Sequence, residues 1–425
     1  MPERHPVNDC VHCGFCLPVC PTYLAWGEEM DSPRGRVELF RALRDGTLSP
    51  TAEVVSHLDR CLGCMACVAA CPSGVRYDVV IEEARSLVHL SGARTWGQRA
   101  RRTLVFALFP YPARLRVAAL LLWLYRASGL RWLVRTAGLL RVLPLLRQLE
   151  GLAPDLGLHE VGATLPTLTP AAGERRGRVA LVTGCVQRVF FPGVNEATVR
   201  ILAAEGFEVA IPPRQGCCGA LSVHAGREEE ARRMTRALVE RLEEARADWV
   251  LVNAAGCGSH LKDLSHLFRD DPAWRERARS FSARVRDVTE FLAGQPPRAE
   301  RHPLAARVAY HSPCHLGHAQ GVQEPPRALL RAIPGLELVE VPESDQCCGS
   351  AGIYNLVEVE AANEIGGRKV DNVLSTGAAF LASANPGCTL HMQRIVRERG
   401  AELAAAHPLE ILDASLRGEP FPRRR

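Results

Sequence analysis

Residues 10–21 read CVHCGFCLPVCP, and residues 61–72 repeat the same spacing as CLGCMACVAACP. Each stretch has three cysteines separated by two residues, then a fourth three residues later that is followed by proline. In the bacterial two-cluster pattern, the first three thiolates bind one cluster and the fourth reaches the neighbouring cluster. We therefore expect two [4Fe–4S] clusters, one bound by Cys10, Cys13, Cys16 and Cys71, the other by Cys20, Cys61, Cys64 and Cys67.

Structural zinc is the alternative for these eight cysteines, but zinc sites usually take paired Cys-x2-Cys knuckles rather than triplets followed by Cys-Pro. Between the two groups, residues 36–44 and 51–59 have the apolar spacing of helices. This spacing predicts a helical ferredoxin-type domain over residues 1–90. Arg34 and Arg36 follow the first group and are expected to favour an anionic cluster, to contact a partner protein, or to carry surface charge at a helix start.

The composition fits a multidomain globular protein. The chain has 425 residues, of which 47% are hydrophobic and 23% charged, and its net charge of +5 is too small to indicate nucleic acid as a partner. The first ten residues, MPERHPVNDC, lack the apolar core of a secretory signal. We therefore expect a cytoplasmic protein whose 16 cysteines are metal ligands rather than disulfides.

A second cysteine pattern occurs twice in the C-terminal half. The first copy contains Cys185, Cys217, Cys218 and Cys257, and the second contains Cys314, Cys347, Cys348 and Cys388. Both copies have β-rich runs before the cysteines, at residues 178–183, 207–211 and 249–253 and again at 307–311, 336–341 and 379–383. Helical stretches such as 194–205 and 228–247 separate these runs. The pattern predicts two repeated parallel α/β domains, over residues 178–300 and 301–425.

Each of these cysteines is expected near the carboxyl end of a strand, where open parallel sheets bind ligands. Adjacent cysteines in a Cys-Cys-Gly sequence can bridge different irons, so we expect an additional iron–sulfur cluster at these sites, with inert buried thiols as the alternative. Three residues beyond the last cysteine of each copy stand His260 and His391. They are candidates either for a fifth ligand or for packing beside the site.

Residues 91–177 are expected to form a basic helical connector. The segment 91–150 has eleven arginines and one acidic residue, Glu150, together with three tryptophans. Its longest uncharged apolar run, residues 117–125, is too short to cross a bilayer, which needs about 20 residues. We expect these helices to lie on an anionic membrane or a partner protein, or to pack against the α/β domains with solvated arginines.

The chain lacks the G-x-G-x-x-G, P-loop and G-x-S-x-G sequences that would indicate nucleotide binding or a serine nucleophile. We therefore expect no catalytic residues for substrate oxidation here. The fold class expected is multidomain α and α/β, in an electron-transfer subunit rather than a complete enzyme.

The motifs resemble those of the glycolate oxidase iron–sulfur subunits over nearly the whole chain. The matching stretches are SPRGR at 32–36, TGCVQ at 183–187, CCGAL at 217–221, NAAGC at 253–257, HSPC at 311–314, CCGSAG at 347–352 and ANPGC at 384–388. The resemblance implies an oxidoreductase subunit of a glycolate dehydrogenase complex. Partner subunits containing FAD would oxidise glycolate to glyoxylate, and this chain would pass the electrons toward a quinone-linked acceptor. The chain would then lie peripherally on the inner face of the cell membrane.

Three alternatives remain open. Iron–sulfur subunits of lactate and glycerol-3-phosphate dehydrogenases share the clusters and differ in the flavin partner. Heterodisulfide-reductase-like enzymes end the repeat in Cys-x2-Cys, whereas both copies here end in Cys-x2-His, which disfavours disulfide reduction at these sites. The third alternative is a zinc-stabilised interaction protein.

Overall fold

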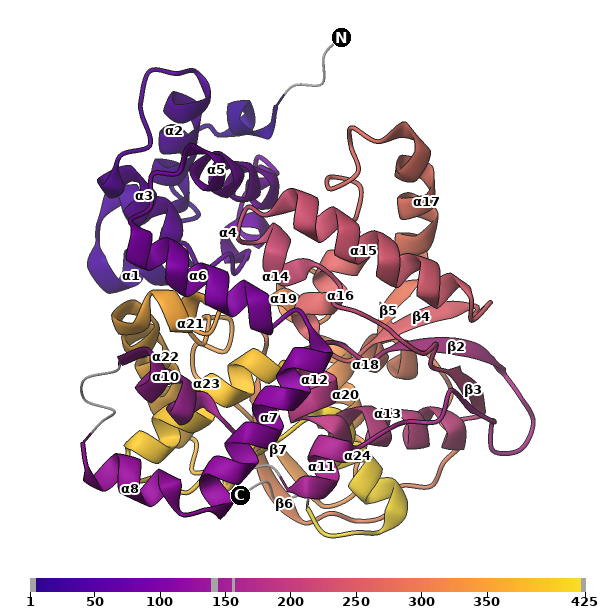
Figure 1. Cartoon of the computed structure of the whole chain (residues 1–425). Helices are drawn as coiled ribbons and strands as arrows, with labels where there is room; N and C mark the ends of the chain where they lie inside the picture. The colour runs from indigo at the N-terminus through magenta and orange to yellow at the C-terminus, as the bar shows by residue number, and fades with distance from the viewer. Residues whose placement is uncertain (1–4, 139–143, 155–156, 422–425) are drawn as a thin grey trace.

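A computed structural model describes residues 5–138, 144–154 and 157–421. It contains a helical N-terminal region, connector helices, and two α/β domains (Figure 1). This architecture confirms the predicted fold class. Residues 139–143 and 155–156 of the expected connector lie outside the described residues.

The N-terminal region is built from short helices around the cysteine loops. They are the 3-10 helices η1 (Pro6–Asp9) and η2 (Glu29–Asp31) and the α-helices α1 (Pro21–Trp26), α2 (Pro33–Arg44), α3 (Ala52–Asp59), α4 (Ala66–Ala69) and α5 (Tyr77–Ser91). Helix α2 begins where Ser32 Oγ accepts a hydrogen bond from Gly35 N (3.1 Å), and Thr51 caps α3 in the same way. Phe40 and Leu58 are buried between these helices, so the helical connection predicted between the two cysteine groups is confirmed.

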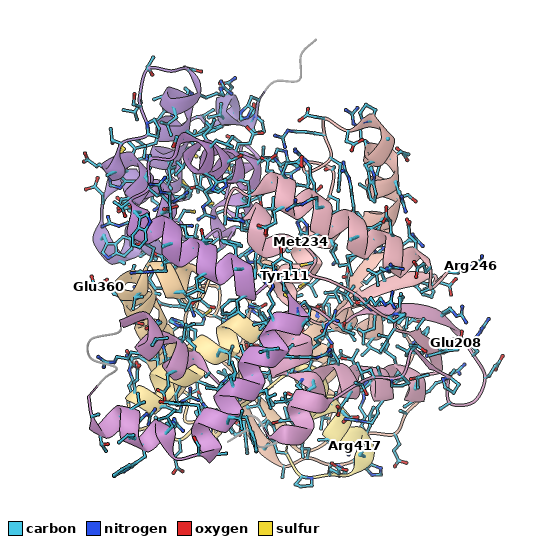
Figure 2. The ribbon with its side chains drawn as sticks, viewed as in Figure 1. Tyr111, Glu208, Met234, Arg246, Glu360 and Arg417 are labelled. Carbon is cyan, nitrogen blue, oxygen red and sulfur yellow. The ribbon has the colours of Figure 1, made fainter. Side chains whose placement is uncertain are left out.

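The connector folds into α6 (Trp96–Leu108), α7 (Pro112–Ala127), α8 (Leu130–Thr136), α10 (Pro144–Leu152) and α11 (Leu158–Gly162). In Figure 1, α6 and α7 run across the front of the α/β domains, and Tyr111 marks the turn between them in Figure 2. Within the described ranges, no single helix is long and apolar enough to cross a membrane. Helices α6 and α7 together have the length and apolar composition of a membrane span, but the chain bends by 98° between them.

The first α/β domain contains a five-stranded sheet in the order β1-β3-β2-β4-β5. Its strands are β1 (Leu168–Thr169), β2 (Gly177–Val182), β3 (Phe207–Ala210), β4 (Trp249–Val252) and β5 (Val285–Asp287). All pairings are parallel except that of β1 with β3. The helices are α12 (Val186–Phe190), α13 (Pro192–Ala204), α14 (Ala220–Val223), α15 (Glu228–Glu243), α16 (Ala255–Lys262), α17 (Pro272–Ala283) and α18 (Val288–Ala293).

The second α/β domain repeats this topology in a parallel sheet of order β7-β6-β8-β9. Its strands are β6 (Ala306–His311), β7 (Leu336–Glu340), β8 (Phe380–Ser383) and β9 (Ala404–Ala406). The helices are α19 (Cys314–Gly317), α20 (Glu324–Arg331), α21 (Tyr354–Val357), α22 (Val359–Leu374), α23 (Pro386–Glu398) and α24 (Pro408–Arg417). In both domains the first predicted strand, β2 or β6, lies between the next two, which confirms the repeat.

The two α/β domains share one apolar core. Val179 and Phe207 of the first domain belong to the same buried cluster as Val308 and Leu330 of the second. Polar contacts add to this interface, since His407 Nε2 lies 2.9 Å from the carbonyl oxygen of Asn253. This packing places the cysteine-bearing edges of the two sheets next to each other.

Candidate functional site

Four cysteines form the first cradle, a small hollow near the N-terminus. Its lining includes Cys10, Cys13, Cys16 and Cys71 together with Arg34. Gly14, at φ +85°, makes the tight turn between two of the cysteines. Arg34 donates a hydrogen bond to the carbonyl oxygen of His12 (3.2 Å) and pairs with Glu29 (2.6 Å), which holds its positive charge beside the hollow. Burial raises the pKa of the Cys16 thiol to about 11, so this thiol becomes a thiolate only with a metal or other cation.

The second cradle lies deeper and is lined by Cys20, Cys61, Cys64 and Cys67 together with Arg36 and Tyr77. Arg36 is fully buried and donates to the carbonyl oxygen of His57 (2.7 Å) and to Thr22 Oγ1 (3.1 Å). Burial by itself would raise the pKa of Cys61, but the guanidinium groups of Arg36 and Arg85 outweigh it and lower that pKa. The fold therefore supplies positive potential where an anionic cluster needs it.

The two cradles are interleaved along the chain. Cys71 joins the triplet that starts at Cys10, and Cys20 joins the triplet that starts at Cys61. The structure thus brings together the same two sets of four that the spacing predicts. Four converging thiols fit a cubane cluster in each cradle, and the assignment of individual ligands stays a prediction.

The Cys-Cys-Gly site of the first α/β domain gathers its four thiols in a row. Cys185 Sγ lies 3.6 Å from Cys217 Sγ, and hydrogen bonds between thiols join Cys217 to Cys218 and Cys218 to Cys257. Gly219 is required between the cysteines and α14, because its φ is +97° and a Cβ there would lie 2.7 Å from Thr235 Oγ1.

The second α/β domain has the same row of thiols, which runs through Cys314, Cys347, Cys348 and Cys388. Asn385 Nδ2 donates to Cys388 Sγ at 3.3 Å. The hydrogen bond to Cys347 and burial raise the pKa of Cys314 well above its ordinary value. Burial also raises the pKa values of Cys347 and Cys348, so without a metal these two thiols and that of Cys314 stay protonated at neutral pH and are poor nucleophiles toward a disulfide.

The two histidines that follow the repeats are engaged in hydrogen bonds. His260 Nε2 lies 3.0 Å from Thr235 Oγ1, and His391 has Nε2 3.0 Å from the carbonyl oxygen of Ala362 and Nδ1 3.5 Å from Asn355 Nδ2. Burial lowers the pKa of each histidine to about 4, which keeps the rings neutral. These contacts favour the packing role over the ligand role.

A different histidine, His311 at the end of β6, lies at the second site. Its ring is buried, and within the described part of the chain neither ring nitrogen has a hydrogen-bond partner. One ring nitrogen and the sulfurs of Cys348 and Cys388 all lie within 4.8 Å of one another. Sequence reasoning missed this residue, although the repeat held a signal: the strand register places Val182 at the corresponding position of β2.

Both Cys-Cys-Gly sites open into one cavity of about 530 Å³, which we call the shared cavity. All eight cysteines of the repeats line it, and helices α7 and α10 of the connector form the opposite wall. The second cradle is adjacent, since Cys64 packs in one buried cluster with Cys347 and Tyr354. Cys16 of the first cradle interacts electrostatically with Cys20 of the second, so the cysteine sites follow one another from the surface to the shared cavity.

Three known domain families match this chain. The 4Fe-4S dicluster domain covers residues 6–75, and the cysteine-rich domain matches twice, at residues 179–262 and 308–393. The linker region of the glycolate oxidase iron–sulfur subunit matches residues 97–153.

A probable glycolate oxidase iron–sulfur subunit from Bacillus subtilis is 40% identical over 421 residues, covering 97% of this chain and 94% of that protein. The chain belongs to the glycolate oxidase iron–sulfur subunit family. The Escherichia coli glycolate oxidase iron–sulfur subunit is 32% identical over 96% of this chain and 94% of its own length. Lactate utilization protein A from an Exiguobacterium species is 29% identical over 56% of this chain and 98% of its own length.

A likeness to one solved structure concerns the fold alone. The crystal structure of a hypothetical protein from Helicobacter pylori has a TM-score of 0.56 at 9% identity and covers 94% of this chain and 71% of that one.

Family membership also bears on the cofactors. A dicluster domain holds two [4Fe–4S] clusters, which confirms the expected cofactors and disfavours structural zinc. The family to which the chain belongs is therefore that of the iron–sulfur subunits of an oxidoreductase, glycolate oxidase.

Proposed function

We propose that this chain carries electrons from FAD-containing subunits, which oxidise glycolate to glyoxylate, toward the quinone pool. The observation that supports this role most strongly is the unbroken series of cysteine sites from the first cradle to the shared cavity. When bound, the clusters supply one-electron transfer. The chain's own residues supply the ligands, the positive charge of Arg34 and Arg36, and the exclusion of water.

Electrons enter at the first cradle in this proposal. Cys13 is exposed, and its neighbours Val11 and Phe15 expose about two thirds of their surface. Exposed apolar residues beside a redox site are typical of a surface that a partner protein covers. We therefore assign the flavin subunit's docking surface to the loop of residues 10–16.

The second Cys-Cys-Gly site holds a further iron–sulfur centre in this proposal, with His311 as an additional ligand. A buried imidazole without a hydrogen-bond partner is costly unless something binds it, and the thiols of Cys348 and Cys388 lie beside it. The first site offers its four thiols without an imidazole at that position, because Val182 stands there. The two repeats are therefore not equivalent as metal sites.

The experiment uses the intact complex, purified without oxygen. Replacing Cys64, at the contact between the second cradle and Cys347, should leave flavin bleaching by glycolate intact while slowing flavin reoxidation by quinone at least tenfold. The matched control is Ser73→Ala, which lies beside Cys71 and removes no thiol. Unchanged reoxidation in Cys64→Ala would refute the proposed path. Turnover of glycolate, D-lactate and glycerol-3-phosphate by the same complex separates the glycolate role from the two related dehydrogenases.

A further inference from the structure

The shared cavity has two unlike walls. One wall carries the cysteines of both repeats. The other is apolar and comes mainly from the connector, with Leu115, Ala118, Leu122, Leu146, Leu149 and Leu152. Iron–sulfur ligation explains the first wall and leaves the second without a role. A large apolar wall facing a redox site is typical of a site for an organic molecule.

The charges around the cavity exclude a small anionic substrate. Among the described residues that line it, there is no arginine or lysine. Its one acidic side chain, Glu150, is neutralised by Arg131 (2.9 Å) and Arg135 (2.8 Å). A hydroxy acid or another carboxylate would be buried without a counter-charge, which is strongly unfavourable. The cavity therefore suits a neutral, largely apolar molecule.

Four polar groups in the cavity lining lack a hydrogen-bond partner in the described part of the chain: Tyr125 Oη, Gln187 Nε2, His224 Nε2 and Ser350 Oγ. Gln187 and Ser350 are almost fully buried, at 2% and 1% exposure. A buried polar group without a partner costs about 1–3 kcal/mol, and few occur in native proteins. Tyr125, Gln187 and Ser350 each offer a hydrogen-bond donor at this cavity, which indicates a ligand with oxygen atoms that accept hydrogen bonds.

Helix α7 is apolar on two faces. Leu115, Ala118 and Leu122 point into the shared cavity, whereas Val117 and Leu121, one position away, are exposed. A helix that is apolar all round is normally buried in protein or lipid.

The mouth of the cavity lies next to this exposed apolar surface. Leu146 lines the cavity and is also 50% exposed, so it marks the opening. Trp132 and Leu133 of α8 are exposed as well, in a segment with ten more basic than acidic residues. Apolar and aromatic side chains interspersed with arginines are typical of helices that lie on an anionic bilayer.

We propose that the shared cavity binds a lipid-soluble quinone. The ring lies among the four unpartnered polar groups, within reach of the cysteine sites, and the isoprenoid tail leaves past Leu146 into the bilayer. This inference rests on the proposed function, and it names the site at which the final electron acceptor binds. Glycolate gives up two electrons, and the cysteine sites deliver them to the quinone. Water supplies two protons, so both quinone carbonyls become hydroxyls.

The test uses the intact complex and two phenylalanine variants of α7. Ala118→Phe fills the cavity, and Ala127→Phe adds the same side chain at an exposed position of the same helix. The measurement is the ratio of glycolate-driven reduction of decyl-benzoquinone to that of a water-soluble dye. We expect this ratio to fall at least tenfold in Ala118→Phe and to stay within twofold in Ala127→Phe. An unchanged ratio in a folded Ala118→Phe complex overturns the inference.

A second measurement does not depend on turnover. An azido-benzoquinone photolabel should attach saturably to residues 115–125 or 146–152, and decyl-benzoquinone should displace it. Labelling confined to the flavin subunits, or no saturable labelling, means that the cavity holds only metal centres, and it overturns the inference. If the wild-type complex reduces neither dye nor quinone with glycolate, the proposed function fails, and the photolabel still decides the quinone site. Should Ala118→Phe not fold, Tyr125→Phe with Ser350→Ala should raise the KM for decyl-benzoquinone about fivefold.

Discussion

Replacing Asp59 with asparagine should loosen the attachment of the connector to the ferredoxin-type domain. Asp59, at the end of α3, is buried and accepts hydrogen bonds from Arg94 Nε (3.0 Å) and Nη2 (2.8 Å). Arg102 of α6 pairs with the same carboxylate at 2.9 Å. The substitution leaves two guanidinium groups without their counter-charge.

Breaking a buried ion pair by removing one partner costs about 3–5 kcal/mol. At about 1.4 kcal/mol per factor of ten, the open population of this contact should rise roughly a hundred- to several-thousand-fold. Hydrogen exchange of the native complex, followed by mass spectrometry over α3 and α6, measures that population directly.

Asp78→Asn is the matched control, because Asp78 pairs with the half-exposed Arg76. An exposed pair contributes about 0–1 kcal/mol, so this variant should change exchange less than about fivefold. If α3 and α6 are equally protected from hydrogen exchange in Asp59→Asn and in Asp78→Asn, the buried ion pair does not hold the connector in place.

The effect of Asp59→Asn also depends on pH. Burial alone would raise the pKa of Asp59, but the hydrogen bond from Arg94 outweighs it, and the pKa lies below its ordinary value. A carboxyl group with a lowered pKa stabilises the fold above its unfolded pKa of about 3.9 and loses this contribution as the pH falls through the folded pKa. The difference between wild type and Asp59→Asn should therefore be full at pH 6 and shrink below pH 4.

Three further predictions concern single sites. Cys71→Ala should remove the electron paramagnetic resonance signal of the cluster in the first cradle, and Cys20→Ala that of the second; the reverse assignment would show that the cradles are not interleaved. His311→Leu should change the spectrum of the second Cys-Cys-Gly site while both cubane signals persist, and an unchanged spectrum would exclude His311 as a ligand. Burial raises the pKa of Glu82 to about 7, so its protonated form stabilises the fold at low pH and this contribution is lost as the pH rises through 7. Glu82→Gln should therefore gain thermal stability relative to wild type between pH 5.5 and 8, and a parallel pH dependence in both proteins would contradict this reasoning.

The local features of this fold could be read from the sequence. Short β-rich runs before the cysteines correctly predict β2, β3 and β4 and their counterparts in the second domain, because buried parallel strands are continuously apolar. The edge strands β1, β5 and β9 were not predicted, since two or three residues give no usable periodicity.

The shared cavity could not be predicted, because it depends on long-range packing. It exists because the two domains share a core that joins residues such as Val179 and Val308, and because α7 then crosses both cysteine-bearing edges. No local pattern encodes these contacts. His311 escaped notice for a different reason: a single histidine at a strand end gains meaning only when the register shows that Val182 holds the equivalent position in the first repeat and the fold brings Cys388 beside it.

The graded burial of the cysteines has a consequence for handling the protein in air. All sixteen cysteines lie in the described part of the chain, and Cys13 alone among them is exposed. Oxidants dissolved in water therefore meet the first cradle well before the deeper sites, because susceptibility follows exposure. Aerobic damage should therefore begin at the first cradle and reach the buried sites later. An aged sample should lose the cluster that accepts electrons from the flavin subunit while the deeper clusters still give the protein its brown colour.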